Sequence, residues 1–224
     1  MQVTKIGNDY SNSYNQVAFK EIRINHIKDN PKLKQAIKDK NFLLLVAGPS
    51  GVGKDSVLNI MIDRFNKIVT HTTRAMRTGE VDGISYFFTT VEKFLEGIKN
   101  NEFVEYVNSF SGKYYGTKKE TITKALDGKK PALAIVDVEG VKSIKDKLKD
   151  DSNVNVVSVF FEPPSLEILK SRLKGRGSET EKSLQERLSR AEYEMSRANE
   201  YDAVISFKTP EEGVEYLNEL LHLK

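Results

Sequence analysis

The fold of this 224-residue chain is decided by residues 42–54, Phe-Leu-Leu-Leu-Val-Ala-Gly-Pro-Ser-Gly-Val-Gly-Lys. The first six residues are apolar without alternation, which is typical of a parallel strand covered by helices on both faces. The glycines that follow predict a tight turn. After it, Val57, Leu58, Met61 and Ile62 recur at helical spacing. A buried strand, a glycine-rich turn and a helix, in this order, are the setting of a phosphate-binding loop.

In such a loop, backbone N–H groups wrap the phosphates, the helix N-terminus adds positive partial charge, and the lysine reaches the β- and γ-phosphates. Lys54 is therefore also a predicted catalytic residue. The predicted ATP-binding residues are Gly48, Pro49, Ser50, Gly51, Val52, Gly53, Lys54, Asp55 and Ser56.

Asp55 stands where such loops normally place the Ser or Thr that ligates Mg²⁺. Three interpretations stay open. Asp55 meets the metal through a water, Ser56 assists, or Asp55 only favours the first helical turn by its negative charge. No metal ligand from the protein is predicted, and Mg²⁺ is expected to be bound mainly through the nucleotide phosphates.

Short apolar runs alternate with helical patterns further along the chain. Residues 132–136, 154–161 and 203–207 indicate buried strands, and a helical pattern follows each one. This alternation predicts an α/β fold, a doubly wound parallel sheet with helices on both faces. Asp137 ends one of these strands, at the carboxyl edge where open α/β sheets bind ligands. We therefore predict a catalytic role for Asp137, with a helix cap as the alternative.

Two segments break the alternation. Residues 70–118 contain strand-like runs at 84–88 and 103–107, and they predict a small mixed lobe inserted into the core. Residues 172–198 are polar and arginine-bearing, and they predict a mobile helical lid. The predicted division is an N-terminal extension, partly helical, at 1–38, and one domain at 39–224, with its core at 39–69, 119–171 and 199–224, its lobe at 70–118 and its lid at 172–198.

Composition excludes several classes of function. The chain has no cysteine, so disulfides, thiolate catalysis and zinc–thiolate sites are excluded. Its 3 histidines are far apart, and its formal charge of +3 is spread along the chain, so neither a histidine metal site nor a nucleic-acid partner is expected. There is no apolar run of membrane-spanning length and no signal-peptide core, so we expect a cytoplasmic enzyme with no membrane partner.

A second informative stretch is residues 72–88, Thr-Thr-Arg-Ala-Met-Arg-Thr-Gly-Glu-Val-Asp-Gly-Ile-Ser-Tyr-Phe-Phe. Arg74 and Arg77 lie three residues apart, and each guanidinium can donate two hydrogen bonds to a phosphate dianion. The alternative, a solvated charged loop, is less favoured because glycines and a tyrosine are interleaved with the charges. The stretch therefore predicts a second phosphate site.

With these residues the chain resembles the guanylate kinases. The matching pieces occur in the order of that family between about residues 42 and 207. They are residues 48–54, residues 72–88, Tyr114-Tyr115-Gly116, Val136-Asp137-Val138 with Gly140, Pro163-Pro164-Ser165, Arg172 with Arg176-Gly177, and Arg187-Leu188.

The resemblance implies a role for each matching residue. The GMP phosphate would be held by Arg74, Arg77, Tyr86 and Tyr115, with Glu80 in the same lobe and Tyr114 as the alternative to Tyr115. Glu105 would accept hydrogen bonds from guanine N1–H and the 2-amino group, and Thr70 and Thr117 would contact O6. Asp137 would also bind GMP. The lid would stabilise the transferring phosphoryl group through Arg172, Arg176 and Arg187, whereas Arg190 is expected at the surface.

The resemblance thus implies phosphorylation of GMP to GDP, with ATP as co-substrate, by a monomer or homodimer. Two alternatives stay open. Ribose 1,5-bisphosphate kinases share the sequence Gly53-Lys54-Asp55-Ser56 but lack the paired-arginine stretch. Non-catalytic guanylate-kinase-like binding modules typically lose the loop lysine and the lid arginines, which this chain keeps.

Overall fold

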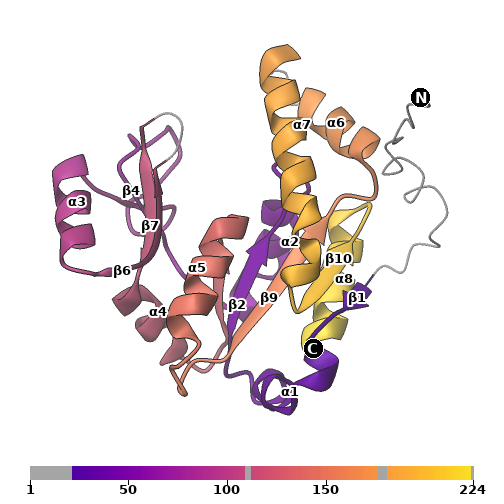
Figure 1. The fold of residues 1–224 in the computed structure, drawn as a ribbon, viewed down its shortest axis with the longest axis horizontal. Coiled ribbons are helices and arrows are strands. Elements are labelled where there is room, and N and C mark those ends of the chain that lie inside the picture. The colour runs from indigo at the N-terminus through magenta and orange to yellow at the C-terminus, as the bar shows by residue number, and fades with distance from the viewer. Residues whose placement is uncertain (1–21, 109–111, 176–180, 223–224) are drawn as a thin grey trace, which may run out of the picture.

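The computed structural model describes residues 22–108, 112–175 and 181–222. Its core is a six-stranded sheet with the order β1-β10-β9-β2-β8-β3 (Figure 1). In that order the strands are Ile22–Ile24, Ala203–Ser206, Val156–Glu162, Leu43–Ala47, Ala132–Ile135 and Asn66–Lys67. β1 pairs with β10 in antiparallel fashion, and the other neighbours are parallel. The predicted α/β fold with a parallel-rich sheet is confirmed.

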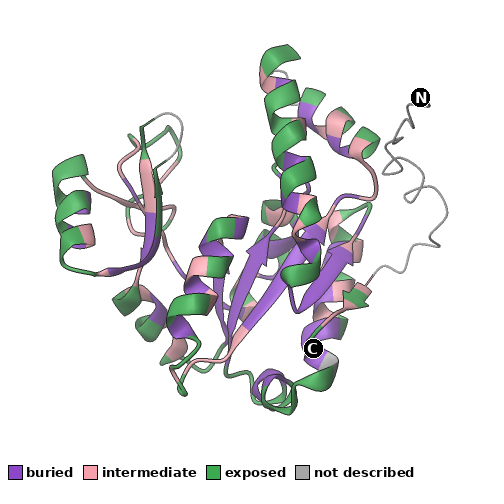
Figure 2. Cartoon of the chain, viewed as in Figure 1, coloured by how far each residue is buried: buried purple, intermediate pink, exposed green. Residues whose placement is uncertain are grey.

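Strand β2 shows why helices cover both faces of this sheet. Leu44 and Val46 belong to one apolar cluster, and Leu43 and Leu45 to another, because successive side chains of a strand point to opposite faces. The sheet is therefore buried from both sides (Figure 2). The first cluster includes residues of α1, α2 and α8, and the second those of α4 and α5, whose bounds are Pro31–Lys38, Lys54–Ile60, Pro210–Leu221, Lys119–Leu126 and Val138–Leu148.

The N-terminal segment is part of this core from residue 22 onward. The helical part of this segment is α1, capped by the Asn30 side chain, which accepts a hydrogen bond from the Leu33 amide, and its apolar residues Leu33, Ala36 and Ile37 are buried. The sequence did not predict β1, which covers the edge of β10. Residues 22–38 are therefore an integral layer of the domain, and for them the predicted separation at residue 38 is corrected.

The predicted lobe forms a second sheet with the order β5-β4-β7-β6, made of Phe87–Phe88, His71–Thr72, Tyr114–Lys118 and Phe103–Asn108. Helix α3, Val91–Lys99, packs on it through Phe94, whose ring stacks on Phe103 at 4.3 Å between centroids. The strand predicted at 84–88 shrinks to its last two residues. The amide of Ser85 donates instead to the Val81 carbonyl at 2.8 Å, which closes a turn.

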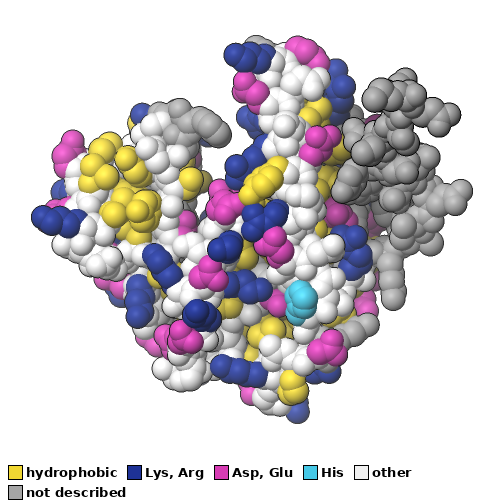
Figure 3. Space-filling view, viewed as in Figure 1, with side chains coloured by type: hydrophobic (Ala, Val, Ile, Leu, Met, Phe, Trp, Pro, Cys, Tyr) yellow, Lys and Arg dark blue, Asp and Glu magenta, His cyan; other side chains and the backbone are white. Residues whose placement is uncertain are grey.

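The predicted lid, residues 172–198, includes the end of α6, Leu166–Lys174, and all of α7, Glu181–Ser196. Leu169 and Leu173 of α6 pack against Leu184 and Ala191 of α7 in a small apolar cluster of their own. Three single turns, η2, η3 and η4, complete the described fold at Ile27–Asp29, Ile62–Arg64 and Ala198–Glu200. In the space-filling view the surface is hollowed between the lobe and the lid (Figure 3).

Gly116 of β7 generates a first prediction, because α3 and β6 press against it. A Cβ atom there would lie 2.8 Å from the Phe103 ring and 2.9 Å from the Glu105 carbonyl oxygen. The backbone oxygen cannot move aside without disturbing the β6–β7 pairing. We expect Gly116→Ala to lower the free energy of unfolding by about 1–3 kcal/mol in urea denaturation. Gly175→Ala is the control, since its nearest neighbour would be at 3.5 Å; equal stabilities of the two variants would contradict this account.

His71 of β4 generates a second prediction. Burial, assisted by Lys118, lowers the pKa of His71 from 6.5 to about 4, and its Nδ1 is buried without a partner among the described residues. The folded chain thus prefers the neutral ring. Its stabilising contribution is complete above pH 6.5 and is lost as the pH falls towards 4.

We expect His71→Phe, which keeps the ring contacts with Phe87 and Phe103, to lose less stability over this pH window than the parent protein. Urea denaturation at a series of pH values measures the difference. Parallel pH profiles for the two proteins would show that His71 does not titrate in this way.

Candidate active site

Residues 48–53 form the turn between β2 and α2, as the sequence predicts. Gly48 has a φ of +145°, and a Cβ atom there would lie 2.3 Å from the Phe161 carbonyl oxygen of β9. Gly53 has a φ of +109° and is the N-cap residue of α2. These two conformations, which favour glycine, let the helix begin at Lys54 directly beside the loop. The first N–H groups of a helix have no partner within the helix itself, and this helix end lies just after β2.

A pocket of about 370 Å³ lies over this loop. Its wall comprises loop residues, Asp55 and Ser56 of α2, the end of β8 up to Asp137, and Glu194 of α7. Lys54 lies along the loop, and its Nζ donates to the carbonyl oxygens of Gly48 at 2.5 Å and Pro49 at 3.1 Å. Of the predicted ATP-binding residues, Pro49 and Val52 are buried beneath the loop, where Val52 joins the core.

Asp137 is a helix cap, the predicted alternative to a catalytic role, and its catalytic role stays a prediction. Its Oδ1 accepts a hydrogen bond from the Gly140 amide at 2.8 Å, which makes it the N-cap of α5. Its Oδ2 lies 3.4 Å from a guanidinium nitrogen of Arg190, and Asp137 is one of the residues that line the pocket. The carboxylate thus caps a helix and lines the phosphate pocket.

The paired arginines of the lobe have different surroundings. Arg74 makes a bidentate ion pair with Glu80, at 2.9 and 2.6 Å, and the Arg77 amide donates to the same carboxylate at 2.7 Å. The Arg74 guanidinium lowers the pKa of Glu80, and this carboxylate raises the pKa of Arg74. Glu80 therefore orients Arg74, whereas Arg77 is exposed.

Strand alternation in β7 separates the two candidate tyrosines. Tyr115 lies in one cluster with Arg74 and Tyr86: the two tyrosine rings are 6.1 Å apart, and the guanidinium lies 5.3 Å from the Tyr86 ring centroid. Tyr114 packs on the opposite side, 5.3 Å from the ring of Phe94. The arrangement favours Tyr115 over Tyr114 as the phosphate ligand.

Glu105 of β6 and Thr117 of β7 form a buried pair facing the core. The Thr117 hydroxyl donates to Glu105 Oε1 at 2.7 Å, and the two residues are 0% and 7% exposed, respectively. Burial raises the pKa of Glu105. Its Oε2 would lie 3.6 Å from a Cβ atom on Gly140, so the pair faces the first turn of α5. Thr70, just before β4, is partly buried, and its carbonyl oxygen accepts a hydrogen bond from Phe87.

The three predicted lid arginines have three different outcomes. Arg187 of α7 reaches the phosphate loop and donates to Ser50 Oγ at 3.1 Å. Arg172 of α6 donates to the carbonyl oxygens of Val52 at 2.9 Å and Lys208 at 2.8 Å, so it ties the phosphate loop to the segment before α8. Arg176 lies outside the described residues. A phosphate contact by Arg172 stays a prediction.

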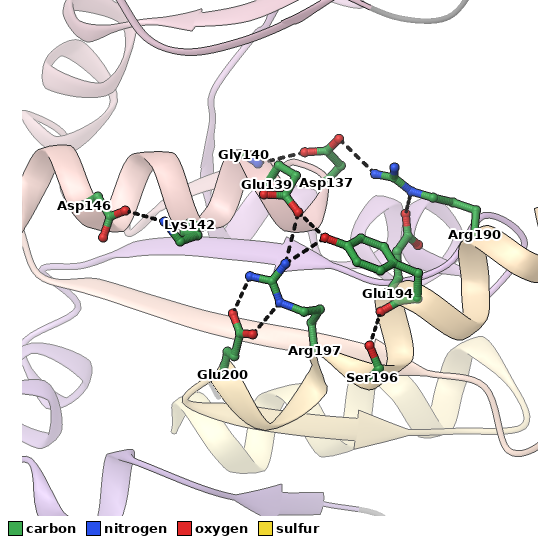
Figure 4. A network of polar contacts seen from close by, with 11 residues as sticks. Asp137, Glu139, Gly140, Lys142, Asp146, Arg190, Glu194, Ser196, Arg197 and Glu200 are labelled. Atoms are coloured by element: carbon green, nitrogen blue, oxygen red, sulfur yellow. Dashed lines mark hydrogen bonds and ion pairs between the residues drawn. The ribbon is translucent and has the colours of Figure 1, made fainter. Parts of the chain in front are cut away.

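Sequence reasoning missed the contacts of Arg190 and Glu194 on α7, where Glu194 lines the pocket and pairs with Arg190 (Figure 4). Arg190 is exposed, as expected, but its Nε donates to Glu194 Oε1 at 2.9 Å and its other end approaches Asp137. The available signal was spacing, because residues 187, 190 and 194 follow one another at i, i+3 and i+7 on one helix face. Composition could not show that this face meets the sheet.

Within the described parts of the chain, no group of three or more His, Asp or Glu side chains could hold a metal ion. Of the helices in those same parts, none has the length and apolar character needed to cross a membrane.

The phosphate loop at the carboxyl edge of a parallel sheet, roofed by an arginine-bearing lid, defines a P-loop nucleotide-binding protein. The chain belongs to the guanylate kinase family, because the family model described as "Guanylate kinase" matches residues 40–224. A guanylate kinase of Rickettsia felis is 37% identical over 188 residues, which are 83% of this chain and 95% of the relative. One of Clostridioides difficile is 40% identical over 169 residues, which are 74% of this chain and 80% of the relative.

The fold gives the same result. A crystal structure of guanylate kinase from Anaplasma phagocytophilum superposes with a TM-score of 0.64 and 29% sequence identity, and the match covers 82% of this chain and 86% of that one.

Arg172 generates a third prediction. We expect Arg172→Ala to raise KM for ATP more than KM for GMP, because the loop loses the tie at Val52. Two hydrogen bonds from a charged donor also disappear, so the thermal midpoint should fall. Steady-state kinetics with each substrate varied, together with thermal denaturation, measures both effects. If kcat alone fell while KM and stability stayed unchanged, Arg172 would contact the reacting phosphoryl group and the tie would be unimportant.

Proposed function

We propose that this protein uses ATP to phosphorylate GMP, giving ADP and GDP. The proposal rests on one observation, which is that two candidate binding sites face each other in one molecule. The phosphate loop provides the ATP site, and the lobe offers a buried Glu105–Thr117 pair beside an arginine–tyrosine cluster. In the reaction, an oxygen of the GMP phosphate bonds to the γ-phosphorus of ATP while the bond from that phosphorus to the β–γ bridging oxygen breaks.

Glu105 and Thr117 supply selectivity for guanine. Thr117 occupies one carboxylate oxygen, and the other remains directed towards the core side of the lobe. A guanine offers its N1–H and 2-amino donors to this carboxylate, whereas adenine lacks the N1 proton. A buried carboxylate left unpaired costs about 1.5–3 kcal/mol or more, which favours guanine over adenine.

The arginine–tyrosine cluster supplies the phosphate-binding end of the GMP site. Arg74 is 12% exposed in its side chain and is held by Glu80, so its direction is set before the substrate arrives. Arg77 is exposed and free to turn inward. Tyr86 and Tyr115 add hydroxyl donors, and Thr70 is proposed to contact guanine O6. A preoriented guanidinium lowers the entropic cost of holding the acceptor phosphate in line with ATP.

On the donor side, the loop amides, Lys54 and the lid arginines neutralise charge on the transferring phosphoryl group. Asp55, Ser56 and Asp137 line the same pocket with oxygen atoms of the kind that Mg²⁺ prefers, so they fit a Mg²⁺–ATP complex that is bound mainly through its phosphates. The metal would neutralise charge on the β- and γ-phosphate oxygens when bound. The lid covers the pocket and limits attack by water.

The two alternative functions are not favoured. The chain keeps the paired arginines that ribose 1,5-bisphosphate kinases lack, and it keeps the loop lysine and lid arginines that binding modules lose. Cytoplasmic location and a monomeric or homodimeric state stay predictions from the sequence.

An ADP-release assay with GMP, AMP, UMP and ribose 1,5-bisphosphate as acceptors tests the function. We expect turnover with GMP well above that with AMP or UMP, and none with the sugar bisphosphate. Turnover with ribose 1,5-bisphosphate but not GMP would refute the proposal. Folded protein that turns over no acceptor would instead indicate a binding module.

Glu105→Gln tests the proposed base contact. An amide cannot accept both guanine donors, so we expect KM for GMP to rise roughly 10- to 100-fold, while KM for ATP changes little. Glu96→Gln, an exposed change on α3, is the matched control. Equal effects of Glu105→Gln on the two substrates would mean that Glu105 supports the fold rather than the base.

A further inference from the structure

One face of α7 carries three charged residues, of which Glu194 lines the phosphate pocket. Arg187 contacts Ser50 of the loop, and Glu194, two turns further on, forms part of the pocket wall. Arg190 lies between them, with its guanidinium between Glu194 and Asp137 (Figure 4). Arginines of one helix thus contact both the phosphate loop, at Ser50, and the end of β8, at Asp137.

Glu194 is an unexpected residue in a pocket built for phosphates. It is 8% exposed, and burial raises its pKa. A buried carboxylate needs a charged or hydrogen-bonding partner, and here the partner is Arg190 Nε at 2.9 Å. Glu194 therefore fixes the direction of the Arg190 side chain, which is itself 45% exposed.

The other end of the guanidinium meets Asp137. The Gly140 amide already holds Asp137 Oδ1, and Arg190 lies 3.4 Å from Oδ2. Both carboxylate oxygens thus have a donor beside them, one from α5 and one from the lid. Because these donors come from different elements, the orientation of Asp137 depends on the position of α7.

The C-terminal end of α7 is anchored to α5, which keeps Arg190 near Asp137. The Tyr193 hydroxyl donates to Glu139 at 2.5 Å, and Arg197 donates to Glu139 at 3.1 Å and to the Tyr193 hydroxyl oxygen at 2.8 Å. The Arg190 guanidinium lies 5.6 Å from the Tyr193 ring centroid. Glu139 is the second residue of α5, so these hydrogen bonds join the end of α7 to the helix that Asp137 caps.

We propose that Arg190 is a positioning residue for phosphoryl transfer: Glu194 holds its guanidinium, and the guanidinium orients Oδ2 of Asp137. This inference rests on the proposed function, in which Asp137 acts at the acceptor edge. The competing explanation is that Arg190 only neutralises the buried charge of Glu194.

Kinetics of GMP phosphorylation by the full chain tests the proposal. We expect Arg190→Ala to lower kcat roughly 10- to 100-fold with smaller changes in KM, because a misplaced catalytic group costs rate more than affinity. In an Asp137→Asn background the same change should cost less than about 2-fold, since the residue it positions is already altered. Asn also caps helices, so α5 should stay capped in that background.

The double variant Arg190→Ala, Glu194→Gln separates the two explanations. It removes the cation and the buried negative charge together, so a neutralising role predicts recovery of kcat, whereas a positioning role predicts kcat as low as in Arg190→Ala. Recovery would overturn the proposal, and so would equal effects of Arg190→Ala in the parent and Asp137→Asn backgrounds. Arg190→Lys should recover kcat only in part, because an ammonium lacks the planar fork.

Lys182→Ala and Glu192→Gln, exposed changes on the same helix, are the controls for lost charge. Thermal denaturation and ADP affinity should be near parent values for Arg190→Ala; a rate loss that merely follows lost stability would contradict positioning. If the parent protein does not phosphorylate GMP, the proposed function fails. If the parent is active and Arg190→Ala matches it, only this inference fails.

Discussion

The rest of the structure depends on one constraint: the backbone N–H groups of the phosphate loop must point towards the phosphates of the nucleotide. Such groups cannot be re-aimed by a change of rotamer, so the loop must be rigid before the nucleotide arrives. The structure fixes it from several sides. β2 is fully buried before the loop, Val52 packs into the core beneath it, and Arg172 holds the Val52 carbonyl from the lid. The doubly wound sheet thus serves as the support for one short turn.

The first turn of α5 is where the parts of the site meet. Asp137 lines the phosphate pocket, Glu139 binds the C-terminal end of α7, and Gly140 lies beside the Glu105 carboxylate of the lobe. The pocket, the lid and the lobe therefore all contact this one helix end. Since α5 packs on the sheet through Val141 and Ile144, the distance between donor and acceptor is set by the core.

The sequence allowed prediction of features whose signal is local. β2, the loop and α2 follow from a buried run, glycines and helical spacing, whereas the sequence leaves the choice between Tyr115 and Tyr114 open. β1 was missed because Ile22–Ile24 is a short edge strand without a clear period. The contacts of Arg190 and Glu194 were missed because a polar helix face has the same sequence pattern whether it contacts solvent or a neighbouring carboxylate. That distinction depends on how the lid docks, which is a tertiary property.

The antiparallel strand β1 has a practical consequence for anyone preparing shortened forms of this protein. The family match begins at residue 40, which invites trimming of everything before it. Such trimming would strip the hydrogen-bonding edge of β10 and uncover the apolar surface beneath Ile27, Leu33 and Ile37. An unpaired strand edge beside exposed apolar surface is a template for intermolecular association. A trimmed protein would therefore aggregate for reasons that have nothing to do with its nucleotide chemistry.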